Sequence, residues 1–410
     1  MAAGGETLTT LSNVLKVRYP QKELRIINYK NSAFWGMLKK NEQAGGSSWR
    51  ITVNYGRSQG SADYSTARTN ITSDDDAGFS VTRARDYHIC TVSSEAIKAT
   101  KGDANALMGA LEKSQNSGMV SFNRSVSQAL YRNGGGARGR LTAASNPGTA
   151  SVTLRNPEDS VHFEINMYVQ SATTDGTSGS VRAGQEKIAG VNRRTGVLTS
   201  TSANWNVVTT AMAASDYLFR AGDFGALIKG LQAWLPASDP TSGDSFFGVD
   251  RSVDPMRLAG VRFTASSGAA KEDTLVDAAS LLGREGGMPD HVLVNPADRA
   301  DMVKNLGTKA QYVMVKSQEA TIGYKALQLD GDKGPIAIVS DPNCPKGTFF
   351  MQQLDTWELG SLDAVPHFTD DDGRIVRRQA GGTSDGVEWQ LAMYGNITCD
   401  APGWNATGTF

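Results

Sequence analysis

The chain has 410 residues, of which 39% are hydrophobic and 20% charged, and its formal net charge is −1. These values are typical of a folded protein with room for about two or three domains, and they exclude an intrinsically disordered chain. The near-neutral charge also excludes a global field that attracts nucleic acid or an anionic membrane. No run of roughly 18 apolar residues predicts a membrane span, and no signal peptide opens the chain, so we expect a protein made and used in a cytosol.

Residues 1–45 predict an N-terminal arm with two short amphipathic helices. The first covers Thr7–Val17 and ends before Pro20, and the second covers Asn31–Lys40, with Trp35 on its apolar side. Small helices with large apolar faces need a partner surface. We therefore expect Trp35 to contact another part of this chain or a neighbouring copy.

Residues 46–99 predict a long β-hairpin. Apolar residues alternate along Ser48–Tyr55 and again along Gly78–Ser93, which indicates two strands. Between them, Gly56–Ala77 has no regular pattern, and connections of that length are usually functional or mobile. A two-stranded ribbon is marginal alone, so it should lie on another surface. On the second strand we expect one apolar face made by Phe79, Val81, Tyr87 and Ile89.

The hairpin carries a set of basic side chains, namely Arg50, Arg57, Arg68, Arg83 and Arg85. Such side chains suit three roles: binding nucleic acid, pairing with carboxylates on a neighbour, or forming an ordinary charged surface. The pattern leaves all three open, and we predict contacts between subunits.

Lys101–Asn133 predicts one long amphipathic helix. Apolar residues recur every three or four positions on one stripe, and Asp103 is placed to cap the first turn. At ~1.5 Å per residue the helix would be roughly 45 Å long, more than is usual in globular proteins. Gly118 is a weak point, since glycine costs about 1 kcal/mol relative to alanine inside a helix.

The long helix ends at three consecutive glycines, Gly134, Gly135 and Gly136. The run Gly134–Arg140 suits a flexible hinge better than a phosphate cradle, because no strand precedes it. A second hinge is predicted at the base of the hairpin, at Gly45 and Gly46.

Residues 137–222 predict a small antiparallel β-module, rich in Ser, Thr, Gly and Asn. Turn pairs such as Asn-Pro, Asp-Gly and Thr-Gly separate short alternating runs, which are Ser151–Leu154, Val161–Val169, Glu186–Asn192 and Gly196–Ser200. Two roles stay open for the module: it braces the subunit, or it presents a surface to solvent.

The following part predicts layered helices and strands. Lys271–Arg284 is expected to be a helix capped by Asp273, and His291–Val294 a short buried strand before a helix that Asn295 caps. A strand followed by a helix in this way belongs in an α+β or α/β layer.

The C-terminal part predicts mainly strands. A buried strand is expected at 335–340, further regular structure at 348–359, and a last strand at Val387–Cys399. Residues 400–410 are expected to form a tail.

The sequence contains no recognisable reactive constellation. Its histidines lie outside metal-ligand spacing of one another and of cysteine, at His88, His162, His291 and His367. The cysteines form no CxxC pair and are odd in number, which favours buried free thiols, at Cys90, Cys344 and Cys399. The motifs GxSxG, HExxH, GxGxxG and GxxxxGKS/T do not occur, and Asp370–Asp372 is typical of a solvated turn. We predict no catalytic, cofactor-binding or metal site, which favours an assembly protein over an enzyme.

The order of these segments resembles the major capsid protein of tailed bacteriophages, in the Hong Kong 97-like fold family. The segments that carry the resemblance are DHVLVNPADRADMV at 290–303, GPIAIVSDPNCPKGTFFMQQLDTWELGSL at 334–362, LAMYGNITCDAPGWN at 391–405 and FFGVDRSVDPMRLAG at 246–260. The resemblance covers most of the chain outside 137–222.

The resemblance implies an α+β phage capsid fold. The implied segments are an N-terminal arm (1–45), an extended hairpin loop (46–99), a peripheral domain with the spine helix (100–136), an inserted β-rich domain (137–222), an axial domain (223–345) and peripheral C-terminal strands with a tail (346–410).

The same resemblance implies a coat protein that assembles as pentamers and hexamers into an icosahedral shell around double-stranded DNA. The implied partners are copies of itself, a scaffolding protein, a portal, decoration proteins and weakly held DNA, with no membrane and no cofactor. The implied location is the virion head, after assembly in the host cytoplasm. Met1 favours a separate scaffolding protein over a removed prosegment, and no Lys–Asn cross-linking pair can be matched.

Two other functions are weighed against the capsid. An encapsulin-like compartment shell is the alternative within the same fold, and the β-module and phage-like closing segments disfavour it. A secreted β-rich hydrolase or adhesin is a remote alternative, because it would need a signal peptide and a pair of carboxylates in a cleft.

Overall fold

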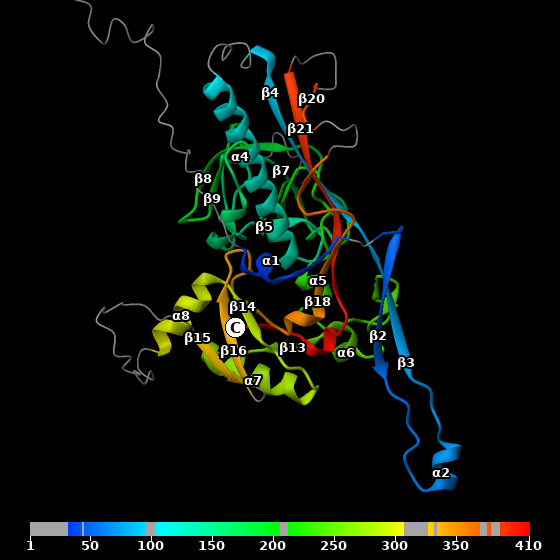
Figure 1. The fold of residues 1–410 in the computed structure, drawn as a ribbon. Coiled ribbons are helices and arrows are strands. Elements are labelled where there is room, and N and C mark those ends of the chain that lie inside the picture. Colours follow the sequence, from blue (N-terminus) through cyan, green and yellow to red (C-terminus); the bar gives the residue numbers. More distant parts are fainter. Residues whose placement is uncertain are drawn as a thin grey trace, which may run out of the picture.

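The structure is a computed structural model, and it describes residues 32–42, 45–95, 104–205, 212–306, 327–331, 334–369, 375–378 and 386–410. Figure 1 shows a body of several sheets around one long helix, from which a hairpin projects. The helix expected at Thr7–Val17, the cap at Asp103 and the turn at Asp370–Asp372 lie outside the described residues.

The described part of the N-terminal arm forms a short helix and an edge strand. Helix α1 (Ala33–Met37) is shorter than the predicted helix Asn31–Lys40, because the chain is extended at Leu38 and continues as strand β1 (Lys39–Asn41). Ser32 caps α1 through its side chain. Strand β1 pairs in parallel with a strand from the C-terminal part of the chain, so the two ends of the sequence share a sheet.

The predicted hairpin is confirmed, and its tip is more regular than expected. Strands β2 (Ser48–Gly56) and β3 (Asp75–Thr82) pair antiparallel and lead away from the body (Figure 1). The expectation of an irregular tip at Gly56–Ala77 is wrong, because helix α2 (Tyr64–Thr69) forms there. Asp63 supplies the reason: its side chain accepts hydrogen bonds from the backbone of the first turn.

The second predicted strand, Gly78–Ser93, is two strands in different sheets. After β3 the chain breaks at Arg83 and continues as β4 (Ala84–Ser93), which pairs along its length with β21 (Gly386–Cys399). The alternation of apolar residues did not indicate that the chain changes its pairing partner from β2 to β21 at this point.

The break at Arg83 also shifts the alternation of side chains, which corrects the expected apolar face. Phe79 and Val81 are fully buried, whereas Tyr87 and Ile89 are 48% and 55% exposed. Side chains on a strand alternate between its faces, so a change of phase by one residue moves every following side chain to the opposite face.

The sheet that receives β4 has β21 as its long central strand. Its order is β1, β18 (Trp357–Ser361), β21 and β19 (His367–Phe368), and β4 and β20 (Arg377–Arg378) also pair with β21. We call this the peripheral sheet. The long helix crosses one of its faces (Figure 1).

The predicted long helix is confirmed as α4 (Ala104–Tyr131), with 28 residues. At ~1.5 Å per residue it is about 42 Å long. Its C-terminal half enters the main core through side chains that are almost fully buried, namely Phe122, Val126, Ala129, Leu130 and Tyr131.

Gly118 is not a flaw in this helix, because α4 continues through it. A Cβ atom built on Gly118 would lie 2.3 Å from Sγ of Cys90 and 3.1 Å from Cδ2 of His88, both on β4. Glycine is therefore the residue that lets the helix lie this close to the strand.

The predicted β-module is one six-stranded sheet. Its strand order is β5 (Ala137–Arg140), β10 (Tyr217–Arg220), β7 (Tyr168–Ala172), β8 (Glu186–Asn192), β9 (Val197–Ser200) and β6 (Ser151–Thr153). The strand expected at Val161–Val169 is wrong, since the 3₁₀ helix η1 (Pro157–His162) and a turn with φ 70° at Asn166 occupy most of it. Phe163, Trp205 and other buried side chains give the module its own core.

A third six-stranded sheet lies on the other side of the main core. Its order is β13 (Val261–Thr264), β22 (Ala406–Thr409), β17 (Thr348–Gln352), β14 (His291–Val294), β16 (Gly334–Ser340) and β15 (Leu327–Gly331). We call this the axial sheet, after the domain that the resemblance implies.

The two faces of the axial sheet belong to different cores. Leu293 and Phe350 join the main core under α4, while Val292 and Phe349 face helices α7 (Lys271–Arg284) and α8 (Pro296–Leu306). This explains why the strands read as continuous apolar runs.

The expected caps of α7 and α8 have different outcomes. The N-cap of α7 is Ala270 and not Asp273, which lies in the first turn. The cap of α8 is as predicted, because Asn295 Oδ1 accepts a hydrogen bond from the backbone N–H of Ala297 at 3.0 Å.

The expectation of a C-terminal tail at 400–410 is wrong. Strand β22 lies between β13 and β17, pairing in parallel with the first and antiparallel with the second. Asn405 and Ala406 are fully buried. The short, Gly- and Thr-rich sequence has no strand pattern of its own, and the strand is stabilised by pairing with its neighbours β13 and β17.

The base of the hairpin is covered by an aromatic cluster on the same chain. Phe79 on β3 contacts Trp234, and Trp234 contacts Phe246, with ring centroids 5.2 Å and 5.1 Å apart. The base of the hairpin therefore lies on another surface of the same chain, as expected for a two-stranded ribbon. Trp234 comes from α5 (Leu231–Trp234) and Phe246 from β11 (Ser245–Phe246). The remaining short elements are β12 (Val249–Asp250), α6 (Pro255–Ala259), η2 (Leu354–Thr356) and η3 (Pro402–Trp404).

Candidate assembly surface

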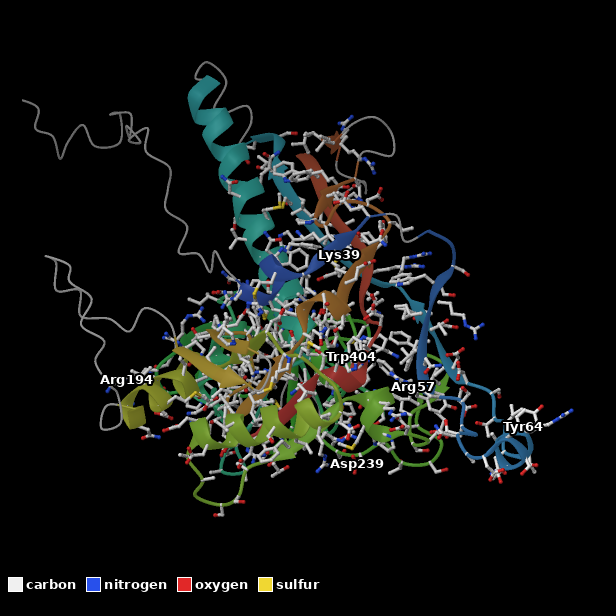
Figure 2. All side chains as sticks on the ribbon, turned by 60° about the horizontal axis from the view of Figure 1, so that its bottom comes forward. Lys39, Arg57, Tyr64, Arg194, Asp239 and Trp404 are labelled. Carbon is white, nitrogen blue, oxygen red and sulfur yellow. The ribbon has the colours of Figure 1, made fainter. Side chains whose placement is uncertain are left out.

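The hairpin tip exposes large apolar side chains far from the body of the molecule. Tyr64 is 81% exposed and Ile71 is 72% exposed. Figure 2 shows Arg57 and Tyr64 along the projecting hairpin. Aromatic and aliphatic side chains presented together in this way are typical of contact surfaces.

The tip is held in shape by local hydrogen bonds and not by a core. Asp63 Oδ1 and Oδ2 accept from the Ser65 and Thr66 hydroxyls at 2.7 Å and 2.8 Å. These two hydroxyls, with the backbone N–H groups of the first turn, lower the pKa of Asp63 to about 2. Across the loop, Gln59 N–H donates to Thr72 Oγ1 at 2.7 Å. The tip is thus ordered before any partner arrives, which reduces the entropy lost on contact.

The structure places the five predicted contact arginines in three settings. Arg50, Arg57 and Arg68 are exposed on the hairpin, and Arg85 is exposed on β4. Arg83 is half-buried at the break between β3 and β4, where it donates to the carbonyl of Gly46. They do not converge on one site, and their predicted role between subunits stays a prediction.

Trp35, the remaining predicted contact, is half-buried beside the main core. The ammonium of Lys40 lies 4.8 Å from the centroid of its ring, a cation–π distance. Part of the ring is therefore already occupied within the subunit.

The peripheral sheet carries an exposed surface that sequence reasoning missed. Tyr87 and Tyr394 lie on its outer face, with hydroxyl oxygens 3.1 Å apart and ring centroids 5.7 Å apart, and Ile89 lies exposed along the same strand as Tyr87. The alternation of β4 was visible in the sequence. Its phase relative to β3 was not, so Tyr87 and Ile89 were expected on one apolar face with Phe79 and Val81.

The predicted hinge glycines lie in contrasting surroundings. Gly45 and Gly46 are exposed, and Gly46 has φ 87°. Gly134–Gly136 are buried, and a Cβ on Gly136 would lie 2.2 Å from the carbonyl oxygen of Asp223. Close packing gives a sufficient reason for glycine there, and hinge motion at either place stays a prediction.

A buried network of charges joins the β-module to α4 and β4. Arg138 donates to Asp223 Oδ2 at 3.0 Å and to Ser125 Oγ at 3.0 Å, and Arg220 bridges Asp223 and Asp86. Burial lowers the pKa of Arg138, and the charge of Asp223 opposes that shift. Pairing and hydrogen bonds are what make burial of such charges tolerable.

His162 lies beside this network in a strongly cationic place. Its side chain is buried, and burial together with Arg132, Arg138, Arg124 and Arg193 holds its pKa well below the ordinary value. The imidazole is therefore neutral at physiological pH, which suits a structural residue.

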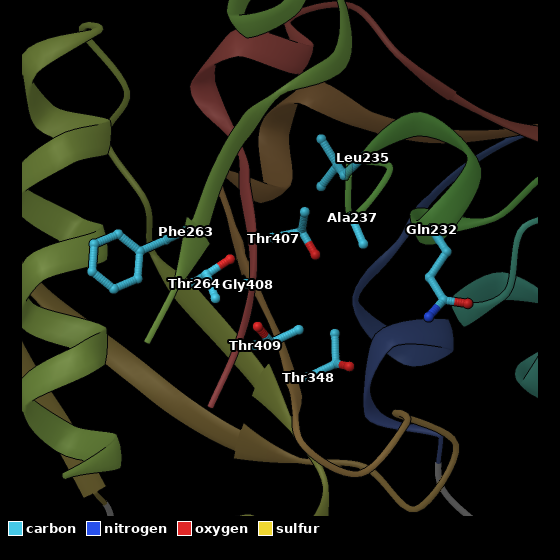
Figure 3. A pocket seen from close by; sticks show the side chains of 9 residues that line it. All are labelled: Gln232, Leu235, Ala237, Phe263, Thr264, Thr348, Thr407, Gly408 and Thr409. Atoms are coloured by element: carbon cyan, nitrogen blue, oxygen red, sulfur yellow. The ribbon is translucent and has the colours of Figure 1, made fainter. Parts of the chain in front are cut away.

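No feature of the described residues suggests catalysis or a tightly held ligand. A cavity of about 80 Å³ lies beside the axial sheet (Figure 3). Its lining carries no charge and consists of apolar residues, threonines and one glutamine, namely Gln232, Leu235, Ala237, Phe263, Thr264, Thr348, Thr407, Gly408 and Thr409. Within the described ranges, no group of His, Cys, Asp or Glu is arranged to hold a metal, and no helix is long and apolar enough to cross a membrane. The three cysteines are buried free thiols, as predicted.

Comparison with known proteins gives a family match for residues 219–393 and a fold for the whole chain. Residues 219–393 match the family model of the SU10 major capsid protein. No curated protein sequence matches the chain. The chain resembles the capsid of cyanophage A-1(L) with a TM-score of 0.58 at 13% identity, over 98% of this chain and 99% of that one.

Two further structures are similar at lower identity. The capsid of a native GTA particle gives a TM-score of 0.51 at 9% identity, over 100% of this chain and 99% of that one. The encapsulin of Synechococcus elongatus gives 0.44 at 8% identity, over 99% and 96%, a likeness too low to carry an argument. The phage capsid fold, predicted from the order of segments, is confirmed.

The family match covers strands and helices on both sides of the main core, including α7, α8 and most of β21. The fold match extends over the hairpin, the spine helix and the β-module as well. Residues 219–393 therefore match the SU10 major capsid protein family, and the chain as a whole has the Hong Kong 97-like α+β fold of phage capsids.

Proposed function

We propose that this capsid protein assembles as pentamers and hexamers into a closed icosahedral shell around double-stranded DNA, without enzymatic activity of its own. The observation that carries the proposal is the β2–β3 hairpin, which projects from the body of the subunit and exposes Tyr64 and Ile71 at its tip. Obligate assemblies cover such side chains with a neighbour and bury thousands of Å² in doing so.

The charge distribution supports pairing of the hairpin with a neighbour's carboxylates. Arg50, Arg57 and Arg68 are exposed, and among the described residues none of them has a salt bridge within the subunit. The chain as a whole carries a formal charge of −1, which suits a wall that holds DNA weakly and does not hinder its packing or release.

Further partners follow from the same proposal. A scaffolding protein guides assembly in the host cytoplasm, and a portal and decoration proteins bind the head. These partners are expected from the resemblance and have no counterpart among the described contacts.

Electron microscopy of the expressed chain, with and without a co-expressed scaffolding protein, tests the proposal. Closed shells or rings of five and six subunits are the expected result. A folded monomer that never assembles under either condition would overturn it. Shells that protect DNA from nuclease support the virus head, whereas shells filled with an enzyme and free of DNA support the encapsulin-like compartment.

A further inference from the structure

Three parts of the subunit meet at one joint, where each part contacts both of the others. The parts are the last turn of α4, helix η1 of the β-module, and the loop 341–347 that leads from β16 to β17. The side chains that make the three contacts are Tyr131, Arg132, Glu158, Asp159, Asp341 and Lys346. We call this set the three-way joint.

The first side of the joint connects the spine helix to the axial sheet. Tyr131 donates its phenolic proton to Asp341 Oδ2 at 2.9 Å, and both side chains are fully buried. Asp341 is held in turn by Asn343, whose backbone and side-chain N–H groups donate to Oδ1 at 2.9 Å and 2.8 Å. Ser32 at the start of α1 also donates to Asp341, at 2.8 Å, so the arm reaches the same point.

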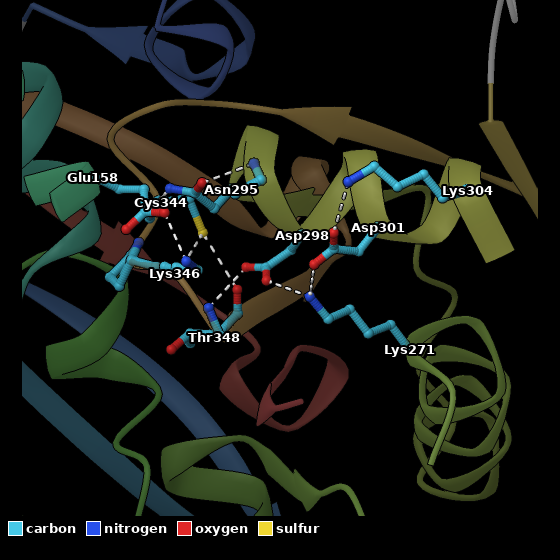
Figure 4. Close-up of polar contacts among 12 residues, drawn as sticks. Glu158, Lys271, Asn295, Asp298, Asp301, Lys304, Cys344, Lys346 and Thr348 are labelled. Atoms are coloured by element: carbon cyan, nitrogen blue, oxygen red, sulfur yellow. Dashed lines mark hydrogen bonds and ion pairs between the residues drawn. The ribbon is translucent and has the colours of Figure 1, made fainter. Parts of the chain in front are cut away.

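The other two sides come from consecutive residues of η1. Asp159 pairs with Arg132 at 3.0 Å, with side chains 11% and 18% exposed. Glu158 pairs with Lys346 at 2.6 Å, with side chains 30% and 41% exposed (Figure 4). Residues in one helical turn thus hold two different parts of the molecule, and only a fixed position of η1 satisfies both.

The β-module is also fixed to α4 at a second level. Arg138 and Ser125 form the buried contact described above, and Arg124 pairs with Glu164. Arg124 and Arg132 are eight residues apart, which is about 12 Å along a helix. Two attachments at this spacing prevent the module from turning about either one.

We infer that the β-module is a brace, which closes the three-way joint and fixes the angle between the spine helix and the axial sheet. Of the two roles left open for 137–222, this assigns the first. A subunit in a closed shell needs a defined angle between these parts, so the brace limits the curvature of the wall; this consequence rests on the proposed shell function. A joint closed on three sides also excludes hinge motion at Gly134–Gly136.

Charge reversal tests the side of the joint that connects the β-module to the loop 341–347, namely the pair of Glu158 and Lys346. Lys346→Glu puts like charges together, and the double variant Glu158→Lys/Lys346→Glu restores the pair with its signs exchanged. Lys304→Glu is the matched control, because Lys304 is exposed on α8 and its salt bridge among the described residues is with Asp301. Lys346→Met replaces the reversal if Lys346→Glu does not fold.

Two measurements are made on every variant: amide hydrogen exchange of unassembled subunits, and shell diameters by electron microscopy. In Lys346→Glu we expect exchange in 157–162 and 341–347 to rise roughly fivefold, as for loss of an exposed pair, and shell diameters to spread. The double variant should return both to the wild-type values, and Lys304→Glu should change neither.

The inference is overturned if Lys346→Glu behaves as the wild type in both measurements, or if the double variant fails to restore them. Faster exchange confined to 134–136, with 157–162 unchanged, would favour the glycine hinge and also overturn it. Failure of the wild-type chain to form shells would remove the proposed function, while hydrogen exchange on the subunit would still decide whether the brace exists.

Discussion

Gly118 lies where the spine helix touches strand β4, and two effects of a side chain there oppose each other. Alanine favours the helix by about 1 kcal/mol over glycine. A Cβ at this place would lie 2.3 Å from Sγ of Cys90, a buried thiol on a strand held by β21. Forcing one extra carbon into such a contact typically costs about 1–3 kcal/mol.

We expect Gly118→Ala to destabilise the unassembled subunit by about 1 kcal/mol, because the clash exceeds the gain in helix propensity. Denaturant unfolding measures this change. Ser121→Ala, at an exposed position of the same helix, is the control and should be neutral or slightly stabilising. Adding Cys90→Ala should recover part of the loss, and a Gly118→Ala subunit as stable as the control would show that the contact yields freely.

His162 predicts a dependence of stability on pH whose sign follows from its surroundings. Its pKa in the folded protein is well below the ordinary histidine value of 6.5, because burial and four arginines disfavour the imidazolium. Below pH 6.5 the unfolded chain therefore binds a proton that the folded chain does not. The contribution of His162 to the free energy of unfolding is therefore fully present above pH 6.5. It falls as the pH decreases below this value, by up to about 1.4 kcal/mol per pH unit for one such group.

His162→Gln should remove this contribution. We expect the loss of unfolding free energy between pH 7.5 and pH 5.5 to be smaller in the variant than in the wild type, although the variant is less stable at pH 7.5 through imperfect packing. Parallel denaturation curves at the two pH values measure both effects. Equal losses in the two proteins would mean that His162 titrates normally in the fold.

The hairpin can be divided into a base that belongs to the subunit and a tip that does not. Phe79 and Val81 at the base are fully buried in the main core, and Ser80 N–H donates to the carbonyl of Phe247 at 2.9 Å. Beyond Gly56 and Asp75 the strands no longer pair, and the described residues there are held by their own loop. Folding therefore depends on the base, and assembly on the tip.

Replacing residues 58–74 by Asn-Gly, a pair that favours a tight two-residue turn, tests this division. We expect a folded subunit with a melting temperature within a few degrees of the wild type and a strongly reduced yield of shells by electron microscopy. Asp63→Ala gives a graded comparison, since it keeps the tip but removes a helix cap worth about 1 kcal/mol. Normal shells from the shortened chain would show that the hairpin is not a clasp between subunits.

The elements that could be predicted from the sequence are those with a long or self-contained pattern. The apolar stripe of α4 and the cap-and-proline start of α8 were both recognised, because local rules decide them. Strands β3 and β4 were predicted as a single strand, because the residue that separates them, Arg83, is neither a glycine nor a proline and gives no signal of a break. Its true partner, β21, lies about three hundred residues away in the sequence, and no local pattern reveals such a pairing.

The assembly surface shows the same limit. The arginines of the hairpin were found, because exposed charge is visible in composition. Tyr64 and Ile71 at the tip were not, because helix α2 and its cap were read as an irregular loop. Tyr87 was predicted on the same apolar face as Phe79, because its exposure depends on which face of the sheet α4 covers.

The subunit is interleaved from distant parts of its sequence, which makes it one folding unit. Strand β1 from the arm edges the peripheral sheet, β21 forms its centre, and the last strand, β22, lies inside the axial sheet between β13 and β17. Closing such long-range contacts is slow in folding and cooperative once complete.

Truncation after Ala401 tests how far the fold depends on its last residues. The deletion removes β22, separates β13 from β17, and takes away Asn405, whose Oδ1 accepts from the indole N–H of Trp357 at 2.8 Å. A tail would be dispensable, but this segment leaves two unpaired strand edges and a buried indole without its acceptor, so we expect no cooperative unfolding transition and little soluble protein. Phe410→Ala, which trims the end of the chain and keeps every strand, is the matched control and should fold. A truncated chain with a wild-type melting curve would show that the axial sheet closes without β22.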